Sequence, residues 1–168
     1  VNFKKEISII VTRYKKKTII YDAFENIHKE QILRKSQIPA KIGKKLNNDA
    51  KIIAKKIADK LNYIGTMCVE FFLTNKNELL VNEIAPRVHN SGHLTMNAYN
   101  VSQFESHIRA VCDLSVKTPK KIRNVIMYNI LGEDIKKFRG KELNKNEFFY
   151  DYGKSEIKDK RKMGHLNK

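Results

Sequence analysis

Two glutamates on either side of a short polar turn are the residues of this sequence with the clearest capacity for chemistry. Glu70 lies in the apolar run TMCVEFFLT and Glu83 in ELLVNEIA. If NKNE forms a four-residue loop between them, Thr74 faces Leu79 and Glu70 falls opposite Glu83. Directly opposed residues have Cβ atoms about 4.5–5.5 Å apart. Two carboxylates at that distance repel each other unless they share a proton or hold a divalent cation such as Mg²⁺.

The alternative is that the strand register slips, or that both glutamates simply point to solvent. Hydrophobic neighbours make a slip costly, because a shift of one residue moves the buried face of a strand to the other side. These neighbours are Val69, Phe71, Val81 and Ile84. The spacing therefore favours a paired acidic site.

A polar segment follows Glu83 directly, in VNEIAPRVHNSGHL. We expect Pro86 to end the strand and the residues after it to form a loop beside the carboxylates. A guanidinium suits a carboxylate, bicarbonate or phosphate because it donates two parallel hydrogen bonds. Histidine can orient an anion or move a proton near neutral pH, and Gly92 allows backbone to approach a ligand. The alternative is an ordinary polar surface loop. The loop residues are Arg87, His89, Asn90, Ser91 and His93.

The segments that must position these groups have sequence patterns that predict an α+β fold with mainly antiparallel strands. EISIIVTRY and KTIIYDAF are β-branched runs around three lysines and predict a hairpin. The segment NNDAKIIAKKIADKLNYIG predicts a helix, because apolar residues recur at helical spacing and Gly65 follows its end. Either Asn47 or Asn48 can cap this helix. The recurring apolar residues are Ile53, Ile57 and Leu61.

A second helix is predicted over SQFESHIRAVCDL. Ser102 and Glu105 have capping-box spacing, and Phe104, Ile108 and Val111 lie on one side. The composition changes near Thr118–Pro119, where NVIMYNILG and FFYDYG predict strands. We therefore expect two domains, over residues 1–117 and 118–168, the second small and β-rich.

The chain has 168 residues, of which 41% are hydrophobic, and a formal net charge of +16. Lysine is spread along the whole chain, which is typical of background composition, so we expect no dedicated nucleic-acid site. A basic module that binds RNA or another polyanion is the alternative. Cys68 and Cys112 form no CxxC pair and are expected to be buried in a reducing compartment, the cytoplasm. No apolar run predicts a membrane span, and the strand-like start at Val1 suggests a fragment.

Three segments together resemble a known family. They are NEIAPRVHNSGH, SQFESHIRAVCDL and RKMGH, and they resemble the 5-(carboxyamino)imidazole ribonucleotide synthases of the ATP-grasp superfamily. The resemblance covers essentially the whole chain but only the C-terminal half of the family's length. It implies that residues 1–117 are the C-terminal part of an ATP-grasp domain, an antiparallel sheet with packed helices. The family's N-terminal domain and its glycine-rich phosphate loop have no counterpart here.

The resemblance also implies a reaction. In the family, ATP, bicarbonate and 5-aminoimidazole ribonucleotide give the N-carboxylated nucleotide, ADP and phosphate in de novo purine biosynthesis. Bicarbonate attacks the γ-phosphate to form carboxyphosphate, and the exocyclic amine captures the carboxyl group. The family is typically a homodimer, and we expect this chain alone to be inactive. Another ATP-grasp carboxylate–amine ligase is the alternative within enzymes, although HNSGH argues against it. A truncated, inactive gene product is a further alternative.

Residue roles follow from the resemblance position by position. Glu70 and Glu83 match the glutamates that bind Mg²⁺, with Mn²⁺ as an alternative ion. The residues that match ATP contacts are Glu6, His28, Asn82 and Glu83, although alternation predicts that Asn82 points away from Glu83. Those near bicarbonate and the amine are Arg87, His89 and Asn90. The basic residues expected to hold the nucleotide phosphate are Lys154, Arg161 and Lys162. The chain departs from the family at Val88, where proline is usual, and at Asp159–Lys160, where Pro-Gly is frequent.

Overall fold

A single nine-stranded sheet organises the molecule, in a computed structural model that describes residues 1–15 and 17–168. The strand order is β6-β5-β1-β3-β4-β7-β9-β8, with β2 paired to β1, and these pairs are antiparallel. The α+β class is therefore confirmed. The strands are β1 (Phe3–Tyr14), β2 (Lys17–Ile20), β3 (Phe24–Lys29), β4 (Ile32–Ile38), β5 (Gly65–Thr74), β6 (Leu79–Ala85), β7 (Val125–Leu131), β8 (Phe148–Asp151) and β9 (Lys162–Asn167).

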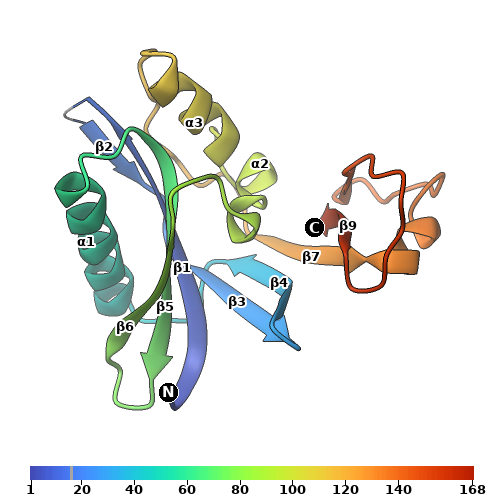
Figure 1. The fold of residues 1–168 in the computed structure, drawn as a ribbon, viewed down its shortest axis with the longest axis horizontal. Helices are drawn as coiled ribbons and strands as arrows, with labels where there is room; N and C mark the ends of the chain where they lie inside the picture. Colours follow the sequence, from blue (N-terminus) through green and yellow to red (C-terminus); the bar gives the residue numbers. More distant parts are fainter. Residues whose placement is uncertain (16) are drawn as a thin grey trace.

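Helices cover both faces of the sheet around β1 and β5 (Figure 1). Helix α1 (Lys44–Lys60) packs on one face, where it contacts the side chains of Ile7, Ile9 and Val11. The other face carries Ile10 and Cys68 and is covered by the segment around α2 (Thr95–Ala98) and by α3 (Gln103–Val111). Short 3₁₀ helices lie at η1 (Asn90–Gly92) and η2 (Gly132–Lys137). Ser8 alternates with Ile7 and Ile9 along β1, so it faces the η1 side.

The first helix was predicted correctly in place but not in detail. It begins at Lys44 with Gly43 at the N-cap, so the predicted cap at Asn47 or Asn48 is wrong. Asn47 instead accepts a hydrogen bond from the Ala23 amide through Oδ1, at 2.8 Å. The fully buried residues of helix α1 are alanines, whose small side chains allow the helix to lie close to the sheet. Leu61, just beyond the end of the helix, is exposed. The buried alanines are Ala50, Ala54 and Ala58.

The second helix confirms the predicted cap, because Ser102 Oγ accepts from the Glu105 amide at 3.1 Å. Its buried face differs from the predicted apolar side. Ile108 and Val111 are exposed, and the buried positions are Gln103, Ser106 and Ala110. Cys112 just after this helix is also exposed, so its predicted burial is wrong, whereas that of Cys68 is confirmed.

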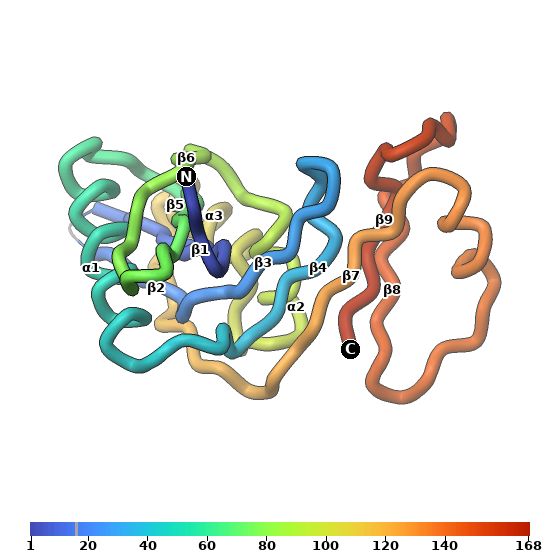
Figure 2. Tube along the Cα trace, turned by 90° about the horizontal axis from the view of Figure 1, so that it is seen from below, coloured from blue at the N-terminus to red at the C-terminus, as the bar shows by residue number. Residues whose placement is uncertain are grey.

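The C-terminal strands extend the same sheet, because β7 pairs with β4 and the β8–β9 pair follows it (Figure 2). They enclose a small core of their own, formed by Ile130, Ile135, Met163 and Leu166. The division into domains at residues 117 and 118 stays a prediction. The predicted β1–β2 hairpin is confirmed, although its turn includes Lys16, which lies outside the described residues. Among the helices described, none is long and apolar enough to cross a membrane.

Candidate active site

The β5–β6 hairpin places Glu70 directly opposite Glu83, as predicted. The route to this pairing differs from the prediction. The Thr74 amide donates to Glu78 O at 3.0 Å and Leu73 pairs with Leu79, so the turn is one residue shorter than expected. A β-bulge between Glu70 and Phe71 then adds one residue to β6 and restores the expected pairing of the glutamates.

Asn82 is the residue that the bulge adds, because Phe71 pairs with Val81 and Glu70 pairs with Glu83. A bulge changes the direction of a side chain relative to strict alternation. Asn82 consequently lines the same small cavity as Glu6, His28 and Glu70. Asn82 and Glu70 are thus neighbours in this cavity, while the direction of Asn82 relative to Glu83 stays a prediction.

Glu70 is an acidic side chain in a largely buried position, with 13% of the side chain exposed. Its Oε1 is buried and, among the described residues, has no hydrogen-bond partner. Burial raises the pKa of the Glu70 carboxyl; the nearby His28 charge opposes this rise, while Glu83 and Glu6 add to it. A buried carboxylate oxygen without a partner, opposite a second carboxylate, fits a hard divalent cation such as Mg²⁺.

Glu6 and His28 form a second pair in the same cavity. Glu6 projects from β1 and His28 from β3, and His28 Nδ1 lies 2.6 Å from Glu6 Oε2. Both side chains are about one quarter exposed, at 22% and 25%. The cavity therefore brings four predicted site residues together from four strands of the sheet: Glu6, His28, Glu70 and Asn82.

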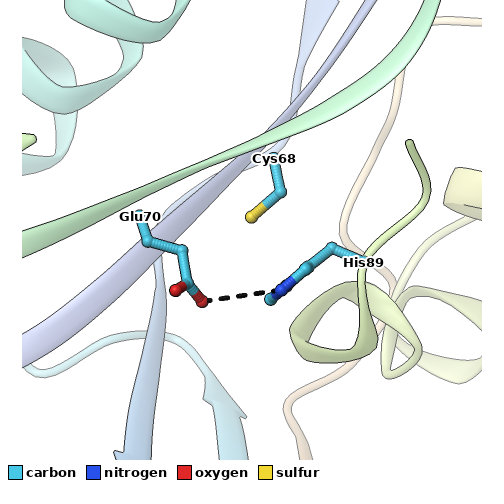
Figure 3. Close-up of side chains that lie close together, drawn as sticks. All are labelled: Cys68, Glu70 and His89. Atoms are coloured by element: carbon cyan, nitrogen blue, oxygen red, sulfur yellow. Dashed lines mark ion pairs between the residues drawn. The ribbon is translucent and has the colours of Figure 1, made fainter. Parts of the chain in front are cut away.

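His89 lies at the start of η1 and points toward Glu70 (Figure 3). Its Nε2 is 3.8 Å from Glu70 Oε1, and donor atoms of Cys68, Glu70 and His89 lie within 4.8 Å of one another. Burial lowers the pKa of His89 to about 4, and the charges of Arg87 and Lys162 contribute. The ring is therefore neutral at pH 7. Burial also raises the pKa of the Cys68 thiol, which keeps it protonated.

Asn90 is held by an amide pair that joins the loop to β7. Its Nδ2 donates to Asn129 Oδ1 at 3.0 Å, and Asn129 Nδ2 donates back to Asn90 Oδ1 at 2.6 Å. Asn129 Nδ2 also donates to Leu33 O, and Asn90 Nδ2 lies 3.4 Å from the Tyr152 hydroxyl. The Arg87 side chain is exposed, and its Nη1 donates to Val88 O at 3.1 Å.

The predicted basic residues divide into an inner pair and an outer residue. Burial lowers the pKa of Lys162, an effect that the nearby Glu70 carboxylate opposes. Lys154 Nζ donates to Lys162 O at 2.6 Å, so these two lysines lie side by side. Arg161 is more exposed and donates through Nη1 to Glu156 O at 3.2 Å. At Asp159–Lys160, where the chain departs from the family's frequent Pro-Gly, Lys160 has a positive φ of 58°. Its Nζ forms an ion pair with Glu30 Oε2 at 2.7 Å.

Sequence reasoning missed the polar residues that support the loop. Ser8, Asn26 and Asn129 occupy strand positions and contact the loop directly or through one another. The signal in the sequence is a single small polar residue inside an apolar run, as in EISIIV and VIMYNIL. A buried polar side chain needs a hydrogen-bond partner, so such positions indicate a buried network.

Comparison with known proteins shows the family to which the chain belongs. The ATP-grasp domain matches residues 1–104. The chain belongs to the ATP-grasp family. The phosphoribosylaminoimidazole carboxylase C-terminal domain also matches, over residues 125–168. This ATP-grasp chain is 46% identical over 168 residues to the N5-carboxyaminoimidazole ribonucleotide synthase of Bacillus subtilis, covering 99% of the chain and 44% of that relative. It thus spans less than half the length of this curated relative, in the C-terminal half.

Solved structures of the same kind of ATP-grasp protein share the fold. An ADP complex of an N5-carboxyaminoimidazole ribonucleotide synthetase is 44% identical, with a TM-score of 0.95 over 99% of this chain and 45% of that chain. The N5-carboxyaminoimidazole synthase of Aspergillus clavatus, in complex with ADP and 5-aminoimidazole ribonucleotide, is 30% identical with a TM-score of 0.94. That match covers 99% of this chain and 47% of the other. The resemblance seen in the sequence is therefore confirmed.

Proposed function

We propose that this chain is the C-terminal part of an ATP-dependent N5-carboxyaminoimidazole ribonucleotide synthase. It would use ATP and bicarbonate to carboxylate the exocyclic amine of 5-aminoimidazole ribonucleotide, releasing ADP and phosphate in cytoplasmic purine biosynthesis. The observation that carries this proposal is the opposed pair Glu70–Glu83, with a buried carboxylate oxygen that lacks a hydrogen-bond partner among the described residues. The relatives named above, which include a complex with ADP and the aminoimidazole nucleotide, support it.

The acidic pair would bind the phosphate end of ATP through a divalent metal ion. Glu70 and Glu83 would hold Mg²⁺ or Mn²⁺, which when bound neutralises phosphate charge. Asn82 and the Glu6–His28 pair lie around Glu70 and would contact the nucleotide. Because Glu70 comes from a central strand and Glu83 from the sheet edge, the pair is rigid on one side and open to ligands on the other.

The loop after β6 would position bicarbonate and the amine. Arg87 is exposed, its charge acts on His89, and its guanidinium suits an oxyanion with two parallel hydrogen bonds. Asn90 is fixed by Asn129, so its amide is oriented before substrate binds. His89 is neutral at pH 7 and can donate one hydrogen bond toward the carboxylate side of the site.

The lysines of the C-terminal unit would bind the phosphate of the nucleotide substrate. Lys162 is close enough to Glu70 for each to shift the pKa of the other, and Lys154 contacts the Lys162 carbonyl. Arg161 adds a charge at the outer side. By analogy with the family the whole protein would be a homodimer.

The test joins this chain to the upstream half of the Bacillus subtilis relative and measures ADP release. We expect release that requires both bicarbonate and 5-aminoimidazole ribonucleotide. The matched variants are Glu70→Gln and Glu83→Gln, each expected to reduce the rate at least 100-fold, with exposed Glu142→Gln as the control that leaves it unchanged. Release that continues without bicarbonate, or that survives both variants, would reject the proposal. Binding to RNA that weakens steeply with salt and ignores both variants would favour a polyanion-binding module.

A further inference from the structure

Four buried polar side chains form a continuous row behind His89, and nothing in the proposed reaction requires them to be polar. They come from β4, β3, β1 and η1, and between 0% and 4% of each residue is exposed. The sheet register places the strand members near one another, because Asn26 pairs with Ser36 on one side and with Glu6, two residues before Ser8, on the other. We call this row the serine–asparagine relay: Ser36, Asn26, Ser8 and Ser91.

Each member of the relay is hydrogen-bonded to the next. Ser36 Oγ lies 2.5 Å from Asn26 Oδ1, and Asn26 Nδ2 lies 3.0 Å from Ser8 Oγ. Ser8 Oγ is 2.9 Å from Ser91 Oγ, which is 2.9 Å from His89 Nδ1. The relay therefore ends on the ring of a residue that faces the acidic site. Burying so many polar groups costs free energy unless the network is fully hydrogen-bonded.

The distances give the relay a direction. O–H···O bonds are typically shorter than N–H···O bonds, so the short contact belongs to the Asn26 carbonyl and the longer one to its amide N–H. Ser8 then accepts from Asn26, so its single proton goes to Ser91. Ser91 in turn accepts from Ser8 and donates its own proton to His89 Nδ1. The Ser91 backbone N–H also lies 3.4 Å from the same nitrogen.

We propose that the serine–asparagine relay fixes the tautomer of His89, so that Nδ1 accepts a hydrogen bond and the ring proton stays on Nε2. Nε2 is the atom 3.8 Å from Glu70 Oε1, where a lone pair on nitrogen would face a carboxylate oxygen and repel it. His89 is then a hydrogen-bond donor to the site and not a proton acceptor. The relay members are positioning residues, since none of them is the group that faces Glu70 Oε1.

This inference deepens the proposed function and rests on it for the identity of the partner oxygen. A donor beside the acidic pair is suited to hold an oxygen of bicarbonate or of its phosphorylated form. The fixed tautomer prevents the ring from acting as a base toward bicarbonate, whose oxygen nucleophile needs no deprotonation by this residue. The relay thus sets the role of His89 before any substrate arrives.

The tautomer can be read directly from the chain of 168 residues, without substrate or the upstream half. The measurement is long-range proton–nitrogen NMR on histidine-labelled protein at pH 8, where imidazoles are neutral. Loss of a set of signals in His89→Gln assigns that residue. We expect His89 Nε2 to carry the proton in at least about 95% of molecules. A wild-type chain with the proton on Nδ1 would overturn the inference.

Two variants test the relay itself. Ser91→Ala removes the last donor, and Ser8→Ala breaks the relay without touching His89. Each should shift the tautomer ratio toward Nδ1–H by about fivefold, equivalent to about 1 kcal/mol for one hydrogen bond. The exposed Ser115→Ala is the matched control and should leave the ratio unchanged. An unchanged ratio in folded Ser8→Ala would reject transmission through the relay. If that variant does not fold, the wild-type ratio and Ser91→Ala decide.

The result of the tautomer measurement does not depend on whether the proposed reaction is correct. If the joined enzyme releases no ADP but the tautomer and its shifts are as expected, the proposed function fails and the relay stands. If ADP release is bicarbonate-dependent but His89 carries its proton on Nδ1, the relay fails and the function stands.

Discussion

At the scale of single residues, the site depends on an acidic side chain, Glu70, that is largely buried before any ligand binds. Glu70 is largely enclosed, its Oε1 has no hydrogen-bond partner among the described residues, and its strand neighbour is another glutamate. His89 is enclosed beside it and neutral. Such an arrangement is costly by itself and becomes favourable when a cation is added. We interpret the acidic pair as a preformed metal site on this ground.

Three histidines, His165 buried and His89 and His93 largely enclosed, predict how stability depends on pH. Burial lowers the pKa of His89 and His165 to about 4 and that of His93 to about 3. In the unfolded chain these groups bind protons near pH 6.5, so the unfolded state binds more protons than the folded state between about pH 4 and 6.5. Stability should therefore fall as the pH drops through this window, by about 1 kcal/mol for each histidine at pH 5.5.

Urea unfolding of the chain at pH 7.5 and pH 5.5 measures this dependence. His165→Gln should reduce the difference in unfolding free energy between the two pH values by about 1 kcal/mol. Equal unfolding free energies at both pH values would contradict the argument.

At the scale of elements, the β5–β6 hairpin shows how two irregularities combine. The turn is one residue shorter than a four-residue loop, and the bulge adds one residue, so the glutamates still face each other. The added residue is Asn82, which the bulge directs into the acidic cavity. The hairpin thereby brings Asn82 to the cavity that Glu70 lines, in addition to pairing the two glutamates.

Deleting Asn82 should separate metal binding from nucleotide binding. The deletion removes the bulge, and the regular register of the outer strand pairs then still brings Glu83 opposite Glu70. We expect Mn²⁺ affinity within about twofold of wild type and ADP affinity weaker by about tenfold, the cost of one hydrogen bond. Calorimetry with the upstream half present measures both affinities. A loss of Mn²⁺ binding equal to that in Glu83→Gln would show that the bulge itself maintains the acidic pair.

The strands with clear patterns were predictable from the sequence, and those with mixed patterns were not. β5, β6 and β7 are apolar or alternating runs bounded by turn residues, and they were placed correctly. The β3–β4 hairpin was missed because ENIHKEQILRKSQI carries charges at many positions, which long side chains tolerate at the half-buried positions of these strands. β9 was missed because KMGHLN has no β-branched residue, and its burial comes from β7 and β8 on either side.

The candidate site was predictable only in part. Glu70, Glu83 and His89 follow from residue type and spacing. The Glu6–His28 pair required the resemblance, since the two residues lie on strands whose pairing the sequence does not indicate. The place of Asn82 in the cavity beside Glu70 was not predicted, because alternation cannot anticipate a bulge. Asn129 and the strand members of the serine–asparagine relay were missed, because their role appears only when distant strands become neighbours.

At the scale of the whole molecule, one continuous sheet joins the acidic cavity to the C-terminal lysines. β7 pairs with β4, and the amide pair Asn90–Asn129 ties the loop to β7. Lys162 begins β9, the strand paired with β7. The relative placement of the metal site and the basic group is therefore set by strand pairing and not by a flexible linker.

This chain alone should not turn over ATP. It spans 44% of the length of the Bacillus subtilis relative, and its seven glycines form no glycine-rich phosphate loop. We expect phosphate release at the uncatalysed background rate with ATP, bicarbonate and 5-aminoimidazole ribonucleotide, and at least 100-fold faster release after the upstream half is added. A coupled phosphate assay compares the two samples. Nucleotide-dependent turnover by the 168 residues alone would contradict the requirement for the missing phosphate-binding elements.

The central claim is that Glu70 and Glu83 bind one divalent ion together. Electron paramagnetic resonance of free Mn²⁺ tests it most directly, in a titration of the joined protein with ADP present. We predict one bound ion in the wild type and in Glu142→Gln, and affinity reduced at least tenfold in both Glu70→Gln and Glu83→Gln. Equal Mn²⁺ binding in wild type and in either glutamine variant would contradict the claim.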